Sequence, residues 1–174
     1  PIYFWNDKNN KKYKDAYFTK YKNIWSHGDF VKKTVNGGYR VFGRSDATLN
    51  PGGVRIGTAE IYNVLNSLNY IEDSLAVGLK DKNDEKILLF VKAVTPNIVT
   101  DNQILKIKKL IKDQLSPRHI PWKIYQVKDI PRTKSGKNSE IIVKQILNND
   151  KISNLDALAN PESLKEYKNI KLYE

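Results

Sequence analysis

A dense run of turn-forming residues, about a quarter of the way along the chain, constrains its fold most strongly. The segment from Arg44 to Gly53 contains Ser45-Asp46 and Asn50-Pro51-Gly52-Gly53. Residues of these types interrupt helices and strands and favour turns. We therefore expect a boundary between two structural units here, and such a segment can act as a hinge.

The residues before this boundary carry the pattern of a β-hairpin. Apolar positions alternate loosely across residues 29–42, on either side of Asn36-Gly37-Gly38. An Asn-Gly pair between two such runs is a strong hairpin signal. Residues 1–43 are therefore expected to be rich in β-structure.

The residues after the boundary mix helices with strands. A helix is expected near Thr58, which can cap it, because Ile61, Leu65 and Leu68 recur at helical spacing. Two strands are expected next, at residues 74–79 and 87–94, and the second of them is almost continuously apolar.

A longer helix is expected after Thr100, which can form a capping box with Gln103. Its apolar stripe should face the core and comprises Ile104, Ile107, Leu110, Ile111 and Leu115. Beyond it we expect a short strand at 123–127, a basic loop at 131–137 and a final helix at 139–147. Because strands and helices mix without strict βαβ alternation, the predicted fold class is α+β.

The charge of the chain raises one functional alternative. Its 30 Lys and Arg against 19 Asp and Glu give a formal net charge of +11, which favours a polyanion partner such as nucleic acid. Only five of the basic residues are Arg, however, and phosphate and base-edge recognition favour Arg. A compositional bias towards Lys explains the charge more simply, so we expect no nucleic-acid partner, although a basic nucleic-acid-binding module stays an alternative.

Other classes are excluded by residues that the chain lacks. It has no Cys and only two His, so disulfides and thiolate metal sites are excluded, and we expect no protein-bound metal. Its apolar runs are too short to cross a bilayer, so no membrane partner is expected. The sequence starts without Met or a signal-peptide pattern, and we interpret it as a fragment of a cytoplasmic protein.

Four local clusters are chemically suited to a nucleotide or a phosphate. No Walker A loop, dinucleotide fingerprint or Ser-His-Asp arrangement occurs. A carboxylate follows a Gly in 26–29, an Arg follows a Gly in 43–46, paired Gly precede an Arg in 50–57, and 131–137 is a cationic loop. Taken singly, each cluster is more often a turn or a solvated surface than a site.

Taken in order, these clusters resemble the C-terminal motifs of the adenylate-forming enzymes, which include acyl-CoA synthetases. The motifs are His27-Gly28-Asp29, Gly43-Arg44-Ser45-Asp46, Gly52-Gly53-Val54-Arg55-Ile56 and Ser135-Gly136-Lys137. Residues 43–62 and the tail Ala157-Leu158-Ala159-Asn160-Pro161-Glu162-Ser163-Leu164 are most similar to the acetoacetyl-CoA synthetase family. The resemblance implies a small mixed α/β lid domain at 47–150 and a hinge at 44–46. It also implies a β-rich remnant of a large N-terminal domain at 1–43 and a C-terminal extension at 151–174.

The resemblance also implies an activity and its small-molecule substrates. Mg-ATP and acetoacetate, or a related short carboxylic acid, would give an acyl-adenylate and pyrophosphate, after which CoA would displace AMP. An adenylation domain that loads a carrier-protein thiol is the alternative. The family's phosphate loop lies in the large N-terminal domain, most of which this fragment lacks. That domain is the expected protein partner, and the fragment is predicted to be inert alone.

The matching residues receive roles by the same resemblance. Asp29, Arg44 and Arg55 would bind the nucleotide, and Asp46 would be the hinge residue. Lys137 would be the catalytic lysine of adenylation. The residues expected at the CoA-binding site are Gly52, Gly53 and Lys112.

Overall fold

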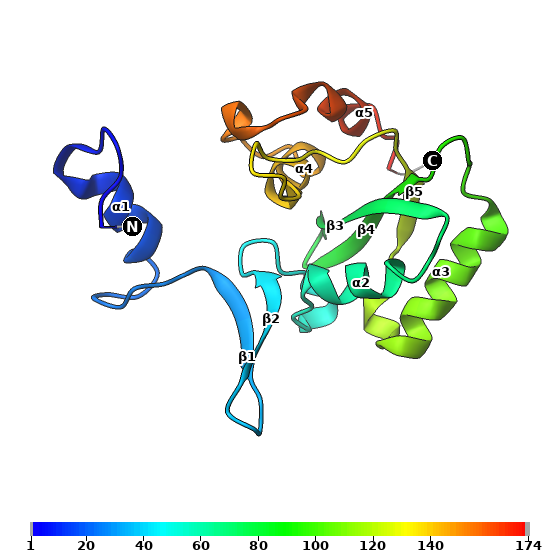
Figure 1. Cartoon of the computed structure of the whole chain (residues 1–174), viewed down its shortest axis with the longest axis horizontal. Helices are drawn as coiled ribbons and strands as arrows, with labels where there is room; N and C mark the ends of the chain where they lie inside the picture. The colour runs from blue at the N-terminus through cyan, green and yellow to red at the C-terminus, as the bar shows by residue number, and fades with distance from the viewer. Residues whose placement is uncertain (1, 173–174) are drawn as a thin grey trace.

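A three-stranded sheet forms the centre of the body of the molecule, as the computed structural model of residues 2–172 shows (Figure 1). Strands β3 (Ile71–Asp81) and β4 (Asp84–Ala93) pair antiparallel, and β5 (Lys123–Gln126) runs parallel to β4. Both strands of the β3–β4 hairpin are longer than the sequence predicted, because their polar ends continue the ladder past the apolar stretches. Residues that alternate along these strands face opposite sides of the sheet and pack into two separate cores.

One face of the sheet is covered by α2 (Thr58–Leu65) and α3 (Asp101–Gln114). Thr100 and Gln103 form the predicted capping box, in which each backbone N–H is bonded to the other side chain. The cap of α2 is Gly57, not Thr58 as predicted, and the Gly57 N–H donates to Glu60 Oε1 at 3.1 Å. A Cβ at Gly57 would lie 2.3 Å from the carbonyl oxygen of Phe42, so only glycine fits here.

The other face is covered by α4 (Glu140–Leu147) and α5 (Leu164–Lys168). The buried ring of Tyr167 meets Phe90 of β4 edge to face, with ring centroids 4.9 Å apart. Short 3-10 turns η3 (Pro117–His119), η4 (Leu155–Ala157) and η5 (Pro161–Ser163) join the longer elements. The mixed class predicted from the sequence is therefore confirmed, with helices on both sides of one small sheet.

The N-terminal part projects from this body (Figure 1). Strands β1 (Asp29–Lys33) and β2 (Tyr39–Arg44) form the predicted hairpin. The sequence did not predict η1 (Lys8–Asn10) and α1 (Lys11–Tyr17) in front of it. The Asp7 carboxylate starts α1 by accepting the N–H groups of Lys12 and Tyr13, both at 2.8 Å. None of the helices in residues 2–172 combines the length and apolar character that crossing a membrane requires.

Candidate functional site

Arg44, the last residue of β2, is the centre of the candidate site. Its Nε and Nη2 donate to the two carboxylate oxygens of Asp46 at 3.0 and 2.7 Å, a bidentate pair. Burial alone would raise the pKa of Asp46, but the hydrogen bonds and charge of Arg44 outweigh this and hold that pKa below its ordinary value. Asp46, the predicted hinge residue, is therefore ionised and paired with Arg44, which is predicted to bind the nucleotide.

The β1–β2 hairpin brings the first two sequence clusters together. Asp29 lies opposite Arg44 in the strand pairing, and its carboxylate contacts Nδ1 of His27. The Ser45 N–H donates to the Gly28 carbonyl at 2.8 Å. A cavity of about 320 Å³ is lined by residues of both clusters, including His27, Gly28 and Arg44. Segments some 15 residues apart in sequence thus form one polar pocket.

Lys137 lies on a tight hairpin, residues 131–139, that borders Arg44 from the other side. A second cavity, of about 290 Å³, is lined by Arg44, Lys137 and Glu140 among other residues. Because Arg44 lines both cavities, they adjoin at this residue. The structure thus brings together Asp29, Arg44, Asp46 and Lys137, four of the residues that the sequence singled out.

Glu140 is a functional candidate that the sequence analysis missed. Burial raises the pKa of its carboxyl, the Tyr62 hydroxyl counteracts this by donating to Oε1 at 3.1 Å, and the charge of Asp46 adds to the rise. Tyr62 also accepts the N–H of Ala76 at 3.0 Å, and burial raises its pKa well above the usual range. No local sequence signal marks Glu140, because its environment arises from the packing of α2 and β3 against α4.

The Gly52-Gly53 turn forms a separate part of the predicted site. Both residues have positive φ, +57° and +77°, which favours glycine. Asp84 Oδ1 accepts the Gly52 N–H at 2.7 Å, and Glu85 Oε1 accepts the Asn50 N–H at 2.8 Å. The turn is therefore held by the first two residues of β4, a contact that the sequence did not reveal.

The two glycines of this turn differ in their surroundings. A Cβ on Gly52 would lie 2.0 Å from Nη1 of Arg118, whereas a Cβ on Gly53 would meet nothing within 4 Å. The backbone at Gly53 thus faces open space. This is the geometry required for close approach of a ligand.

Arg55 and Lys112 are exposed and are not drawn into either cavity beside Arg44. Lys112 lies in the last turn of α3. Across residues 2–172, neither side chain is engaged in a hydrogen bond or an ion pair. Their predicted roles in binding phosphates therefore stay predictions.

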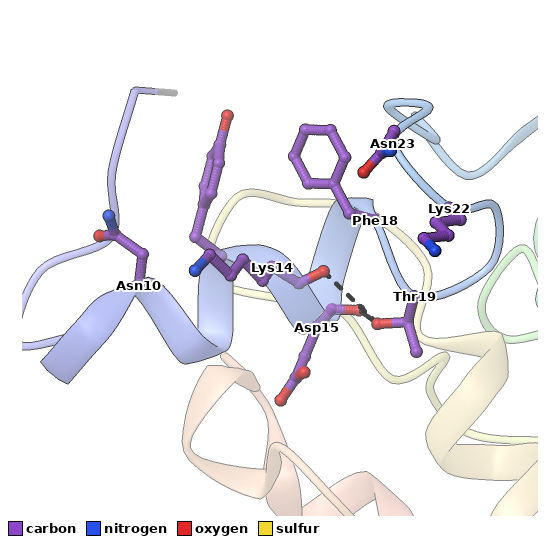
Figure 2. Close-up of a pocket in the computed structure, with 8 residues that line it drawn as sticks. Asn10, Lys14, Asp15, Phe18, Thr19, Lys22 and Asn23 are labelled. Carbon is purple, nitrogen blue, oxygen red and sulfur yellow. Dashed lines mark hydrogen bonds between the residues drawn. The ribbon is translucent and has the colours of Figure 1, made fainter.

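A cavity of about 730 Å³ lies beside α1 and shares the lining residues Asp15 and Thr19 with the cavity of about 320 Å³ (Figure 2). The Thr19 hydroxyl donates to the Asp15 carbonyl at 2.7 Å at its edge. The residues that line the cavity are Asn10, Tyr13, Lys14, Asp15, Phe18, Thr19, Lys22 and Asn23. None of them was predicted to bind nucleotide or CoA. Residues 2–172 contain no group of three or more His, Asp or Glu side chains arranged to hold a metal ion.

Known proteins similar to this chain share one activity in their names. The chain is 47% identical over 164 residues to acetoacetyl-coenzyme A synthetase of Rhizobium meliloti, covering 94% of this chain and 25% of the relative. It is 46% identical over 170 residues to acetoacetyl-CoA synthetase of Caenorhabditis elegans, covering 96% of this chain and 24% of the relative. The chain thus spans about a quarter of the length of these relatives.

Solved structures agree with the sequence relatives. Acetoacetyl-CoA synthetase from Streptomyces lividans superposes with a TM-score of 0.85 at 36% identity, covering 97% of this chain and 26% of that one. The anthranilate CoA ligase AuaEII, in complex with anthranoyl-AMP, has a TM-score of 0.67 at 22% identity, covers 79% of this chain and 26% of its own, and shows the fold alone. No family profile matches the chain.

Proposed function

Because this chain is related along nearly its whole length to the C-terminal quarter of acetoacetyl-CoA synthetases, as its motifs predicted, we propose that it is part of an AMP-forming acid–thiol ligase and that its residues 47–150 are the mobile lid. The observation that carries this proposal is the meeting of Arg44, Asp46 and Lys137 around two adjoining cavities, with Asp29 opposite Arg44 in the strand pairing. Two cationic side chains and a ribose-binding carboxylate at one place suit a nucleotide.

The proposed reaction has two steps. In the first, a carboxylate oxygen of acetoacetate or a related short acid attacks the α-phosphorus of Mg-ATP, and the bond to pyrophosphate breaks. In the second, the thiol sulfur of CoA attacks the carbonyl carbon of the acyl-adenylate, and the carbon–oxygen bond to AMP breaks. The thiol proton passes to solvent, and the products are the thioester and AMP.

The residues near Arg44 are assigned to the first step. Asp29 and Arg44 contact the ribose, and Arg55 lies near a phosphate. Lys137 stabilises the negative charge that develops on the carboxylate and α-phosphate oxygens, because a fixed cation at the reacting centre lowers the barrier. Asp46 is the residue about which the lid rotates between the steps.

The Gly52-Gly53 turn is assigned to the second step. Its open backbone face at Gly53 lets the pantetheine arm of CoA pass closely, and Lys112 lies near the CoA nucleotide. The acyl pocket and the phosphate loop are expected in the part of the enzyme that corresponds to the other three quarters of the relatives.

The proposal is tested by joining the chain to that part of a relative, such as the Streptomyces lividans enzyme. We expect pyrophosphate release with ATP and acetoacetate, and thioester formation when CoA is added. The 174-residue chain alone should release none. Turnover by the chain alone would contradict the division of the site, and an inactive joined enzyme with correct folding would contradict the proposed activity.

A further inference from the structure

The tail motif 157–164, singled out above only as a resemblance, lies directly against the hairpin that carries Lys137. The Ala159 N–H donates to the Arg132 carbonyl and the Lys134 N–H donates to the Ala157 carbonyl, both at 2.8 Å. Thr133 and Leu158 face each other between these bonds as an antiparallel bridge. The tail thus adds a short third strand to the Lys137 hairpin.

The hairpin itself is closed by its own hydrogen bonds. The Thr133 N–H donates to the Lys137 carbonyl at 2.8 Å, and the Gly136 N–H donates to the Thr133 carbonyl at 2.7 Å. The Arg132 guanidinium spans it, with Nη1 donating to the Gly136 carbonyl at 2.6 Å and Nη2 to Asp73 Oδ2 at 2.5 Å. The backbone at Lys137 is therefore held by the strand that starts at Arg132. Contacts that fix this strand also fix Lys137.

The Asn160 side chain fixes the start of that strand through its carbonyl oxygen and its two amide N–H groups. Its Oδ1 accepts the Arg132 N–H at 2.8 Å. Its Nδ2 donates to the Ile130 carbonyl at 3.0 Å and to the Asp129 carboxylate. Asn carries one carbonyl and two N–H donors in one plane, and neither Asp nor Ala provides this combination. One side chain is thus hydrogen-bonded to three residues, Asp129, Ile130 and Arg132, that lead into the hairpin.

The tail is docked by contacts that do not involve Asn160. Leu158 is buried with Ile142 of α4 and with Leu164. Tyr167 is buried against Phe90, and its hydroxyl donates to the Asp129 carbonyl at 3.0 Å. Loss of the Asn160 amide should therefore loosen the hairpin without releasing the tail.

We propose that Asn160 is a positioning residue that holds the Lys137 hairpin in the geometry needed for adenylation. This inference rests on the role assigned to Lys137 in the proposed function. A displacement of about 1 Å at a reacting group can cost on the order of a hundredfold in rate. A tail that stiffens this hairpin therefore bears directly on the first step and not on the second.

Hydrogen exchange of the 174-residue chain tests the anchoring without any enzymatic assay. In Asn160→Ala we expect the amides of Lys134 and Gly136 to exchange about tenfold faster, or more, while those of β3 and β4 keep their protection. The matched control is Asn169→Ala, which removes the same amide from an exposed position of the same tail. Hairpin amides that exchange alike in both variants and the wild type would overturn the proposal.

A charge-exchange pair keeps the test valid if Asn160→Ala unfolds the chain. Asn160→Asp keeps the shape and the acceptor but loses both donors and adds a negative charge beside Asp129. Adding Asp129→Asn should restore a donor between the two side chains and recover hairpin protection at least in part. A double variant that exchanges as fast as Asn160→Asp would contradict the role of this contact.

The joined enzyme separates failure of this inference from failure of the proposed function. Asn160→Ala should slow adenylation about tenfold or more and leave thioester formation from supplied acyl-adenylate unchanged. If Lys137→Ala slows adenylation and Asn160→Ala does not, the positioning role is wrong and the proposed function stands. If Lys137→Ala leaves adenylation unchanged, the role assigned to Lys137 is wrong and the positioning role falls with it, whereas the proposed function is contradicted only if the joined wild-type enzyme is inactive.

Discussion

Three glycines permit one perturbation to be made at three functionally different places. Gly37, Gly53 and Gly136 have φ of +81°, +77° and +80°, and a Cβ at any of them would meet no heavy atom within 4 Å. Gly37 lies in the β1–β2 turn, Gly53 in the turn assigned to CoA, and Gly136 next to Lys137. A change to leucine at each position therefore imposes the same backbone strain, and its Cβ adds no clash.

The stability cost of each substitution follows from the backbone alone. Placing an L-residue in the left-handed region costs about 1–2 kcal/mol. We expect the free energy of unfolding of the 174-residue chain, measured in urea, to fall by this amount in all three variants. Because the costs match, any difference in activity between the variants reports position rather than stability.

The activities should separate when each step is assayed in the joined enzyme. Gly53→Leu places a side chain where the pantetheine is proposed to pass, so thioester formation from supplied acyl-adenylate should fall at least about a hundredfold, equivalent to about 2.7 kcal/mol. Adenylation should persist. Gly136→Leu should show the reverse pattern, because it strains the hairpin beside Lys137.

Gly37→Leu is the control for both effects and should leave each step near its wild-type rate. The reasoning is refuted if Gly53→Leu depresses both steps equally. It is also refuted if Gly37→Leu blocks thioester formation as strongly as Gly53→Leu does.

Two further predictions concern single side chains. Lys137→Ala should lower the single-turnover rate of adenylation by about 10²–10³-fold, because it removes a cation from the developing charge, and an unchanged rate would exclude that role. Burial lowers the pKa of His119. Glu60, whose Oε2 lies 3.9 Å from His119 Nε2, raises this pKa by less, so the pKa stays below its ordinary value. Below the ordinary pKa of 6.5 the unfolded chain takes up a proton that the folded chain resists, so the free energy of unfolding should fall as the pH drops through this range. Urea titrations from pH 8 to 5 should show this slope reduced in His119→Gln, and an equal slope in both proteins would contradict it.

Features encoded by neighbouring residues were predictable from the sequence. The capping box of Thr100 and Gln103 depends on residues three apart, and the β1–β2 turn depends on the Asn36-Gly37 pair, so both were found. Helix α1 was missed because its first turn is capped by Asp7, which lies before the helix, and because it lacks a continuous apolar stripe.

Features created by distant contacts were not predictable. Glu140 gains its environment from Tyr62, 78 residues earlier in the chain, and the Gly52 turn is held by Asp84, 32 residues later. Asn160 acts on residues about 30 positions before it. Motif resemblance identified the residues proposed to touch substrates and included Asn160 in the tail motif, whereas the contacts by which side chains hold other residues in place depend on packing and carried no local signal.

The contact between Arg44 and Asp46 bears on the proposal that the hinge lies beside a nucleotide-binding residue. Arg44 is fixed by the ladder of β2, so it stays with the hairpin, whereas Asp46 lies at the start of the connection to the sheet. The two side chains are 59% and 44% exposed, and an ion pair this open to solvent contributes no more than about 1 kcal/mol. Rotation of the backbone about Asp46 therefore meets little resistance from the pair. In the proposed rotation, the bidentate geometry would orient the Arg44 guanidinium in one state, and the weakness of the pair would leave the lid free to reach the other.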